Sequence, residues 1–383
     1  MKKHNLSKRI FLSPPHMSGN ELRFIKKAFA SNYIAPAGPQ VKEFESEFSH
    51  ISGFKHCAAL VSGTAAMHLA LRHYGVGKGD SVLCQSLTFM GGVSPVTFLG
   101  AHPVFIDSDT ISWNMDMNLL ESELKKRSRV GKTPKVVITA DIYGQPADLD
   151  VAAKLCNKYG SVLLSDSCEA VGAKYKGSFA GKGAKAAVYS FNGNKIITTS
   201  GGGMLASDDE ALVKNAKFLA EQARENFPYY QHETIGYNYR LSNISAAIGL
   251  GQLTVLDKRI NQCRAIFQYY HSNLGSIDGI GFMPEPAWGK ANHWLTVITL
   301  DPGKTKTLPE DIRQALEVEN IESRPLWKPM HLQPVFSRCA RVGGAVSEKL
   351  FKTGLCLPSG TAIAKSDLAK VCSVIKETIH NNV

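Results

Sequence analysis

The sequence predicts an α/β fold: a large, mainly parallel sheet domain covered by helices, plus a small C-terminal α+β domain. Strand and helix patterns alternate through the first half of the chain, which favours parallel strands covered by helices on both faces. The length of 383 residues exceeds what one core normally holds, so we expect a domain of about 250 residues and a smaller one. With 44% hydrophobic and 20% charged residues, the composition is that of an ordinary soluble enzyme.

The N-terminal segment is predicted to be an arm, a helix and a loop. Residues 1–19 form the arm, and Leu22, Ile25 and Phe29 then recur at helical spacing on one face. The stretch 31–39 ends with two prolines and a glycine in four residues, which cannot continue a helix. We therefore expect a loop there, lying either over a pocket or on the surface.

Strand and helix patterns follow in alternation up to residue 206, with no internal repeat. Strands are predicted at Cys57–Val61, Ser81–Gln85, Pro103–Ile106, Lys135–Ala140, Ser161–Ser165, Ala186–Phe191 and Gly203–Ala206. Helices are predicted at Ala65–Tyr74, Gly91–Phe98, Leu119–Lys126 and Val151–Tyr159.

The C-terminal part is predicted to begin with a helix that joins two domains. From Leu241 to Leu274, apolar residues recur mostly at steps of three and four, which indicates one long helix. The large domain is therefore expected at residues 20–255 and the small domain at residues 256–383. The elements expected in the small domain are Trp294–Leu300, Asp311–Glu319 and Ser366–Ile379.

The formal net charge of +11 allows an anionic partner but does not select one. Basic residues are spread along the chain, the densest run is Lys125-Lys126-Arg127, and no aromatic-rich RNA-binding pattern accompanies them. Nucleic acid is therefore not an expected partner. An anionic small molecule and a merely solvated basic surface both remain open.

Hydropathy and cysteine usage indicate a cytoplasmic protein without membrane spans, disulfides or a metal site. No window approaches 18 consecutive apolar residues, and the charged N-terminus is not followed by an apolar signal region. The eight cysteines include no CxxC pair and have no histidine neighbour at metal-ligand spacing. We expect reduced, mostly buried thiols.

Lys195 stands between an apolar strand and a glycine turn, within the stretch from Ser190 to Gly203. The end of a strand is the usual place for functional groups in an open α/β sheet. If the side chain is partly desolvated there, its neutral amine can attack a carbonyl and form a Schiff base. On the lysine alone, a strand end that lies in solvent is the favoured alternative.

Two further strand ends carry polar groups. Ser62-Gly63-Thr64-Ala65-Ala66 precedes a helix, so its backbone N–H groups and hydroxyls can cradle a phosphate, although a plain helix cap fits as well. Asp166 ends an apolar strand, and a buried carboxylate there needs a cation such as a protonated pyridine nitrogen. A turn cap or a metal ligand are the alternatives for Asp166.

The order of these groups along the chain is more informative than any one of them. A phosphate loop, an aromatic residue after a strand (Phe89), Asp166 and then Lys195 supply the phosphate anchor, stacking face, pyridinium partner and amine that pyridoxal phosphate requires. In this order the sequence resembles the fold-type I pyridoxal phosphate enzymes and, within them, the nucleotide-sugar aminotransferases of the DegT/DnrJ group. The matching stretches are Ser62–Ala66, Ser86–Phe89, Asp166–Ala170, Ser190–Lys195 and Gly236–Ser242.

The resemblance implies the catalytic pair and the cofactor contacts. Lys195 would form the Schiff base and Asp166 would keep the ring nitrogen protonated, while Glu169 would lie near the phenolic oxygen, where glutamine or histidine is common. Lys195 also separates this chain from a dehydrating subset of the family, which has histidine at that position. The implied cofactor-binding residues are Gly63, Thr64, Ala65, Phe89, Asp166, Glu169, Ser190, Asn192, Lys195 and, from the neighbouring subunit of a homodimer, Asn238.

The resemblance also implies a substrate class. It is closest to enzymes that transfer an amino group from L-glutamate to C4 of a UDP-linked 2-acetamido-2,6-dideoxy-4-ketohexose, on the way to bacillosamine-type sugars of bacterial glycans such as lipopolysaccharide. The implied substrate contacts are Asn32, Tyr33, Ile34, Ala35, Arg240, Arg324, Trp327, Lys328, Met330 and His331.

Three alternatives stay open at this point. Trp327 and Met330 are equally compatible with packing roles in the small domain. The substrate is alternatively a dTDP- or GDP-linked keto sugar, aminated at C3 or C4. A regulatory protein that holds pyridoxal phosphate without turnover is the remaining reading, which the complete set of Lys195, Asp166 and phosphate loop disfavours.

Overall fold

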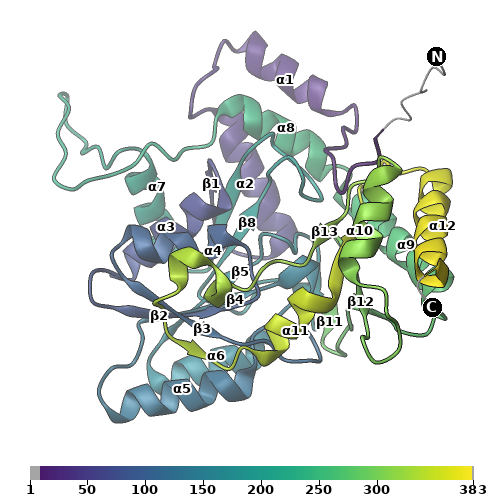
Figure 1. Ribbon diagram of the computed structural model, residues 1–383. Coiled ribbons are helices and arrows are strands. Elements are labelled where there is room, and N and C mark those ends of the chain that lie inside the picture. The colour runs from purple at the N-terminus through teal and green to yellow at the C-terminus, as the bar shows by residue number, and fades with distance from the viewer. Residues whose placement is uncertain (1–8, 382–383) are drawn as a thin grey trace.

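A computed structural model of the chain describes residues 9–381, and its largest element is an eight-stranded sheet (Figure 1). The strand order is β1-β9-β8-β5-β4-β2-β3-β14. β9 pairs antiparallel with β1 and β8, and all other pairings in this sheet are parallel. The strands are β1 His56–Leu60, β2 Ser81–Gln85, β3 His102–Ile106, β4 Val136–Ala140, β5 Val162–Asp166, β8 Ala186–Ser190, β9 Gly203–Ser207 and β14 Arg341–Val342.

Helices cover both faces of this sheet, as the strand sequences require. Successive side chains of a strand point to opposite faces, and the central strands are apolar on both. Leu60 and Val188 pack in a core with α3, α4 and α7, whereas their neighbours Ala59 and Tyr189 pack with α2 and α8. The covering helices are α2 Pro39–Ser52, α3 Gly63–His73, α4 Met90–Phe98, α5 Met117–Arg129, α6 Leu149–Tyr159, α7 Glu210–Ala220 and α8 Asn243–Leu253. The predicted α/β class is confirmed.

The carboxyl ends of the parallel strands meet at one edge of the sheet. β5 ends at Asp166 and the adjacent strand β8 ends at Ser190, five residues before Lys195. The segments that follow β1 and β2 reach the same edge, and they carry Thr64 and Phe89. Topology therefore brings together groups that are far apart in the sequence.

A second, antiparallel sheet of four strands lies in the C-terminal part, in the order β10-β12-β15-β13. Its core includes apolar side chains of α9, α10 and α12, among them Tyr270, Ile312 and Ile375. The elements are α9 Leu256–Leu274, β10 Ile280–Phe282, β12 Thr296–Leu300, α10 Pro309–Val318, β13 Arg324–Pro325, α11 Ala345–Thr353, β15 Gly354–Leu357 and α12 Lys365–Asn381. The remaining short elements are β6 Lys174–Tyr175, β7 Ser178–Phe179, β11 Gly289–Lys290, η1 Ile142–Gly144, η2 Met330–Leu332 and η3 Pro334–Phe336.

The predicted domain boundary between residues 255 and 256 stays a prediction. It coincides with the start of α9, but β14 lies well beyond it and pairs with β3 in the large sheet. The C-terminal part therefore contributes one strand to the large sheet.

The expectation of a single long helix from Leu241 to Leu274 is wrong. The structure has α8 and α9 instead, separated at Thr254 and Val255. The Thr254 hydroxyl donates a 2.6 Å hydrogen bond to the Gly251 carbonyl, and Val255 leaves the helical region with φ −121° and ψ 9°. Side-chain hydrogen bonds of this kind compete with the helical backbone pattern.

The first helix is present, but its buried face differs from the expected one. In α1 (Glu21–Ala30), Leu22 and Phe29 are exposed and Ile25 is only partly buried, whereas Phe24 and Ala28 are buried. The reason is Glu21, whose carboxylate accepts hydrogen bonds from the Ser18 backbone and from the Gln252 side chain of α8. This anchoring turns the Glu21 side of α1 inward.

Helix α2 was not predicted, although the sequence marks its start. Pro39 occupies its first turn, where a missing N–H costs nothing. Val41, Phe44 and Phe48 follow at helical spacing and are fully buried. The prolines that predict a loop before residue 39 thus also mark the beginning of a helix.

Candidate active site

A cavity of about 230 Å³ lies at the carboxyl edge of the large sheet. Its lining comes from the ends of β1, β2, β4, β5 and β8 and from two tryptophans of the C-terminal part. The predicted site residues in this lining are Gly63, Thr64, Phe89, Asp166, Glu169, Ser190, Asn192, Lys195 and Trp327. Ala65 is buried in the first turn of α3, behind the lining.

The N-terminus of α3 forms one wall of this cavity. Ser62 is the helix cap, because its hydroxyl accepts the Ala65 N–H at 3.0 Å. Close packing needs glycine at residue 203, where a β-carbon would overlap the Gly63 nitrogen. A helix N-terminus with accessible N–H groups and the Thr64 hydroxyl is a suitable anion site, so the helix-cap and phosphate-cradle interpretations are compatible.

Asp166 is buried at the floor of the cavity, and its carboxylate has little protein stabilisation. Among residues 9–381, the backbone hydrogen bond that it accepts comes from the Cys168 N–H at 3.2 Å, and no ion pair involves it. Burial raises the pKa of Asp166, against the opposing influence of Cys168 and the charge of Lys195. A buried carboxylate in this state favours a cationic group in the cavity, and a protonated ring nitrogen fits that requirement.

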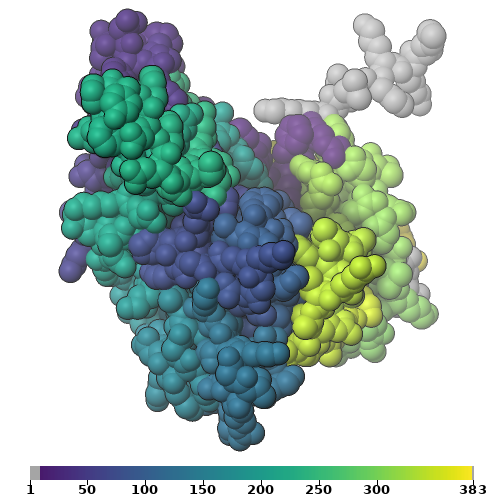
Figure 2. Space-filling model, turned by 90° about the vertical axis from the view of Figure 1, so that its left-hand side faces the viewer, coloured from purple at the N-terminus to yellow at the C-terminus, as the bar shows by residue number. Residues whose placement is uncertain are grey.

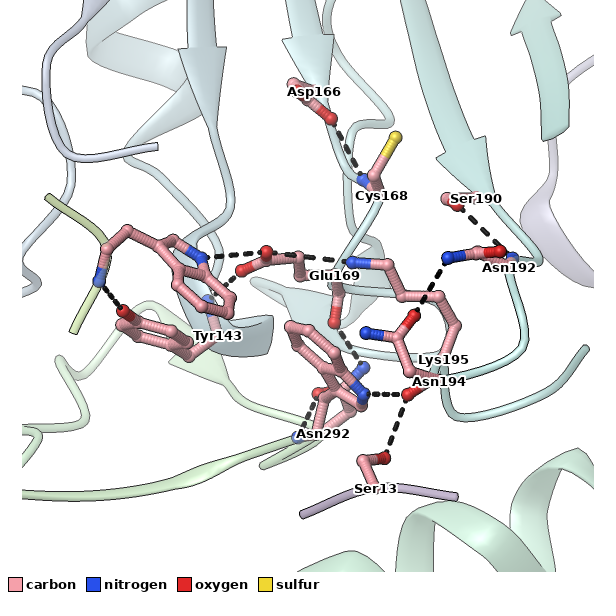
Figure 3. Close-up of polar contacts among 12 residues, drawn as sticks. Ser13, Tyr143, Asp166, Cys168, Glu169, Ser190, Asn192, Asn194, Lys195 and Asn292 are labelled. Atoms are coloured by element: carbon pink, nitrogen blue, oxygen red, sulfur yellow. Dashed lines mark hydrogen bonds and ion pairs between the residues drawn. The ribbon is translucent and has the colours of Figure 1, made fainter. Parts of the chain in front are cut away.

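Lys195 lies inside the cavity rather than in solvent (Figure 3). Its side chain is only 11% exposed, so the interpretation as a solvated strand end is excluded. The Nζ atom lies 3.6 Å from Glu169 Oε1 and 3.9 Å from the centre of the Trp294 ring.

Glu169 is the most heavily engaged carboxylate of the site. Its Oε2 accepts the Tyr143 N–H at 2.6 Å and its Oε1 accepts the indole N–H of Trp327 at 3.1 Å (Figure 3). Burial raises the pKa of Glu169, while Lys195 and these two donors act in the opposite direction. Glu169 therefore connects the lysine with the segment that carries Trp327.

Sequence reasoning missed Trp294, Asn292 and Tyr143. Trp294 is buried, and its indole N–H donates to the carbonyl of Asn194, the residue before Lys195, at 2.7 Å. Asn292 donates to the Glu169 carbonyl and accepts the Trp294 N–H. No local signal marks Asn292 and Trp294, because they precede a strand of the other sheet about a hundred positions after Lys195, and Tyr143 lies in the short η1 turn after β4.

The structure leaves several predicted substrate contacts, and the predicted cofactor contact Asn238, away from the cavity. Asn32, Tyr33 and Ile34 are exposed on the loop after α1. The Ala35 carbonyl accepts a hydrogen bond from the Asn243 N–H. Asn238 is exposed on the segment between α7 and α8, and Arg240 forms an ion pair with Glu221 there. Within one chain, none of these side chains lines the cavity around Lys195.

Met330 and His331, expected among the substrate contacts, instead pack inside the protein. Met330 joins the core of the large sheet. Both ring nitrogens of His331 are engaged, Nδ1 with the Ser86 hydroxyl at 2.6 Å and Nε2 with Glu348 at 3.2 Å. The packing alternative therefore holds for Met330, whereas Trp327 lines the cavity.

A second, more open hollow of about 650 Å³ adjoins the cavity and shares Asn194, Trp294 and Trp327 with it. Arg324 lies in its lining, together with Phe11 and neighbouring residues of the N-terminal arm. Lys328 is partly exposed and lies outside both linings. Glu322 lies in the same lining and forms an ion pair with Arg324 at 2.9 Å, so a molecule that reaches Lys195 through this hollow would pass this ion pair and several apolar side chains.

Comparison with known proteins agrees with this geometry. Residues 15–376 match the model of the DegT/DnrJ/EryC1/StrS aminotransferase family. EpsN of Bacillus subtilis, named as a pyridoxal phosphate-dependent aminotransferase, is 50% identical over 379 residues, which are 98% of this chain and 97% of EpsN. GDP-perosamine synthase of Caulobacter vibrioides is 32% identical over 97% of this chain and 98% of its own length.

A solved structure shares the fold. The DegT DnrJ EryC1 StrS aminotransferase from Brucella abortus superposes with a TM-score of 0.87 at 26% identity, covering 94% of this chain and 95% of that one. No helix in the described part of the chain has the length and apolar character needed to cross a bilayer. By the family match and the two relatives, the chain belongs to the DegT/DnrJ/EryC1/StrS family and is a pyridoxal phosphate-dependent sugar aminotransferase.

Proposed function

We propose that this enzyme transfers the amino group of L-glutamate to the C4 keto carbon of a UDP-linked 2-acetamido-2,6-dideoxy-4-ketohexose. The observation that carries the proposal is the convergence of Lys195, Asp166 and the N-terminus of α3 on one cavity. The adjoining hollow has room for a phosphorylated sugar, and Arg324 in its lining would contact a phosphate by exchanging its ion pair with Glu322. The predicted cytoplasmic location remains a prediction.

The residues around the cavity suit pyridoxal phosphate. The N–H groups of Gly63 and Thr64 at the start of α3 would hold the phosphate, with Ser190 beside them. Asp166, buried and lacking a cationic partner among the described side chains, would hold the ring nitrogen in its protonated form. Phe89 lies in the same lining and is the candidate for the stacking face.

When bound, the cofactor supplies an electron sink, which makes removal of a proton next to the amine feasible. Lys195 would bond the cofactor covalently and, once released, carry that proton through Nζ. Asp166 would maintain the positive charge on the ring. Trp294 and Trp327 would shield the Nζ atom from water, because both lie in the cavity lining and Trp294 is buried.

A GDP-linked 4-keto sugar is the second candidate substrate. The relative from Caulobacter vibrioides carries such a nucleotide in its name, and its similarity extends over nearly the whole of both chains. A dTDP-linked sugar and amination at C3 have no comparable observation in their favour.

The proposed enzyme is a homodimer with shared active sites. α1 and the loop between α7 and α8 stand at the same end of the molecule (Figure 2), and both expose large apolar side chains. A second copy seated there would cover these side chains and bring Asn238 toward the partner's cavity. The exposed residues are Leu22, Phe29, Tyr33, Ile34, Phe227, Tyr229, Tyr230 and Ile235.

The test is a product assay with a panel of UDP-, GDP- and dTDP-linked 4-keto sugars. Each is incubated with the holoenzyme and L-glutamate, and products are identified by mass spectrometry and by NMR of the aminated carbon. We expect amination of the UDP-linked N-acetylated sugar and none with the Lys195→Ala variant. Amination of only the GDP-linked sugar would replace the first candidate by the second.

A further inference from the structure

The free amine of Lys195 has two fixed neighbours in the cavity. In every amine transfer through a Schiff base, the lysine must release its covalent bond and later restore it. A buried ammonium group without partners is costly, so the released side chain needs a defined place in the protein. The structure contains such a place.

Two groups flank the Lys195 Nζ atom within 4 Å. The Oε1 atom of Glu169 lies 3.6 Å away, and the centre of the Trp294 ring lies 3.9 Å away. An ammonium group is attracted both by a carboxylate and by the face of an indole ring, whereas a neutral amine is attracted far less by either. The two neighbours therefore stabilise the same charged state of the amine.

Both neighbours are fixed in position by the surrounding protein. The Trp294 indole N–H is bonded to the Asn194 carbonyl at 2.7 Å, which prevents the ring from turning away from the lysine segment. The Glu169 carboxylate is held by the Tyr143 N–H and by the Trp327 indole N–H. The arrangement is thus preorganised, because neither group has to move in order to receive the amine.

One buried side chain joins the two neighbours. Asn292 is fully buried, accepts the Trp294 N–H at 2.8 Å and donates to the Glu169 carbonyl at 3.0 Å (Figure 3). It also donates to the Val171 carbonyl at 3.0 Å, so its amide has a single orientation. The spacing between the indole ring and the carboxylate therefore depends on Asn292.

We infer that Glu169 and Trp294 form a holding site for the ε-ammonium group of Lys195, occupied whenever the lysine is released from the cofactor and carries a proton. The inference rests on the proposed function only in the assignment of Lys195 as the residue that bonds the cofactor. Glu169 and Trp294 are then positioning residues for the lysine. Glutamine or histidine is common at the corresponding position of the family. A carboxylate suits the holding role better than either, because it pairs directly with the ammonium charge.

The experiment uses the full chain without cofactor and measures the chemical reactivity of Lys195. Trace acetic anhydride is added, and peptide mass spectrometry compares acetylation of Lys195 with that of the exposed Lys132 as an internal reference. Only the neutral amine reacts, so a holding site for the ammonium group slows the labelling of Lys195.

Three variants separate charge from shape. Glu169→Gln keeps the size of the side chain and removes the charge, and Trp294→Leu removes the ring. We expect both to raise the labelling of Lys195 relative to Lys132 at pH 7.5 by about tenfold. Trp294→Phe keeps an aromatic face and is the matched control, expected to stay within about twofold of wild type. Circular dichroism identifies any variant that does not fold.

Amide hydrogen exchange of the segment 190–203 distinguishes this site from a loosening of the packing. If the holding site acts through charge, exchange in this segment should be the same in wild type and in Glu169→Gln. Unchanged labelling in Glu169→Gln at pH 7.5, or an increase accompanied by faster exchange of this segment, would overturn the holding site. Failure to aminate any keto sugar would overturn the proposed function without affecting this measurement.

Discussion

Gly92 lies directly against Asp166: a β-carbon at residue 92 would overlap the Oδ2 atom of the Asp166 carboxylate. Residue 92 belongs to α4, where alanine would normally be preferred to glycine by about 1 kcal/mol. The glycine at this position therefore allows the close approach of the buried carboxylate and the helix. It lets Asp166 reach the floor of the cavity.

Gly92→Ala should accordingly weaken cofactor binding while the fold is retained. The added methyl group displaces the carboxylate from the position where it would meet the ring nitrogen, and we expect the Kd for pyridoxal phosphate to rise by about tenfold or more. Titration of the cofactor absorbance band measures the effect. Gly193→Ala is the control, because its nearest neighbour would be the Ser200 carbonyl oxygen at 4.0 Å. Equal affinities of the two variants would contradict the assigned role of Asp166.

Asp166→Asn tests the same carboxylate by charge rather than by position. A neutral amide keeps the size of the side chain but cannot hold a ring nitrogen protonated, so turnover should fall by about 10²- to 10³-fold. Steady-state kinetics and a circular dichroism spectrum measure activity and fold together. A variant that folds normally and has a turnover within about threefold of wild type would contradict the role assigned to Asp166.

Asp141 should make the stability of the cofactor-free protein depend on pH. Burial is the main cause that raises the pKa of Asp141 to about 7, from an ordinary value of 3.8. The carboxyl group of Asp141 binds its proton more tightly in the folded state than in the unfolded state. The free energy of unfolding of the protein therefore falls as the pH rises from about 4 to about 7. The integrated effect reaches at most about 4 kcal/mol in the free energy of unfolding.

The Asp141→Asn variant isolates this contribution, because an amide does not titrate. Its free energy of unfolding relative to wild type should increase between pH 5 and pH 8, as measured by urea denaturation. The Ser167 hydroxyl and the Ala147 N–H, which donate to Asp141, remain in place in the variant. If the difference between variant and wild type is the same at both pH values, Asp141 does not titrate in this range.

The shared active site of the proposed homodimer can be tested by complementation. Asn238 is exposed and lies outside the lining of the cavity in its own chain. If it serves the partner's cofactor, mixing inactive Lys195→Ala chains with inactive Asn238→Ala chains should restore activity. Random exchange makes half of the dimers mixed, each with one intact site of two, so recovery should approach about a quarter of the wild-type sites.

Native mass spectrometry must verify that the two chains exchange, and Asn238→Ala alone must be severely impaired. Under these conditions, a mixture that stays inactive would show that Asn238 serves its own subunit. The shared site would then have to be abandoned.

The sheet and half of the site follow from local sequence patterns. Ser81–Gln85 is predicted to the residue, because apolar strands between turns leave little ambiguity. Asp166 and Lys195 could be placed in one site because parallel strands end at a common edge. Both inferences use only the nearest few residues and the topology of an α/β sheet.

The other half of the site depends on packing between distant segments. Trp294 and Asn292 lie before a strand of the small sheet, and nothing around them in the sequence differs from an ordinary strand start. His331 shows the converse case, since the side chain of this predicted substrate contact is buried between Ser86 and Glu348. Tertiary contacts determine the hydrogen-bond partners of these side chains, and local periodicity in the sequence does not encode such contacts.

The Asn194 carbonyl accepts hydrogen bonds from Ser13 and from Trp294, which lie 181 residues before and 100 residues after it. The peptide unit next to Lys195 is thus tied to both the beginning and the later part of the polypeptide. During synthesis, a nascent chain that has emerged only as far as β9 has the lysine but lacks Trp294. Cofactor capture should therefore be a late event in biogenesis, and retention of the cofactor reports that the N-terminal arm and the C-terminal part have both docked.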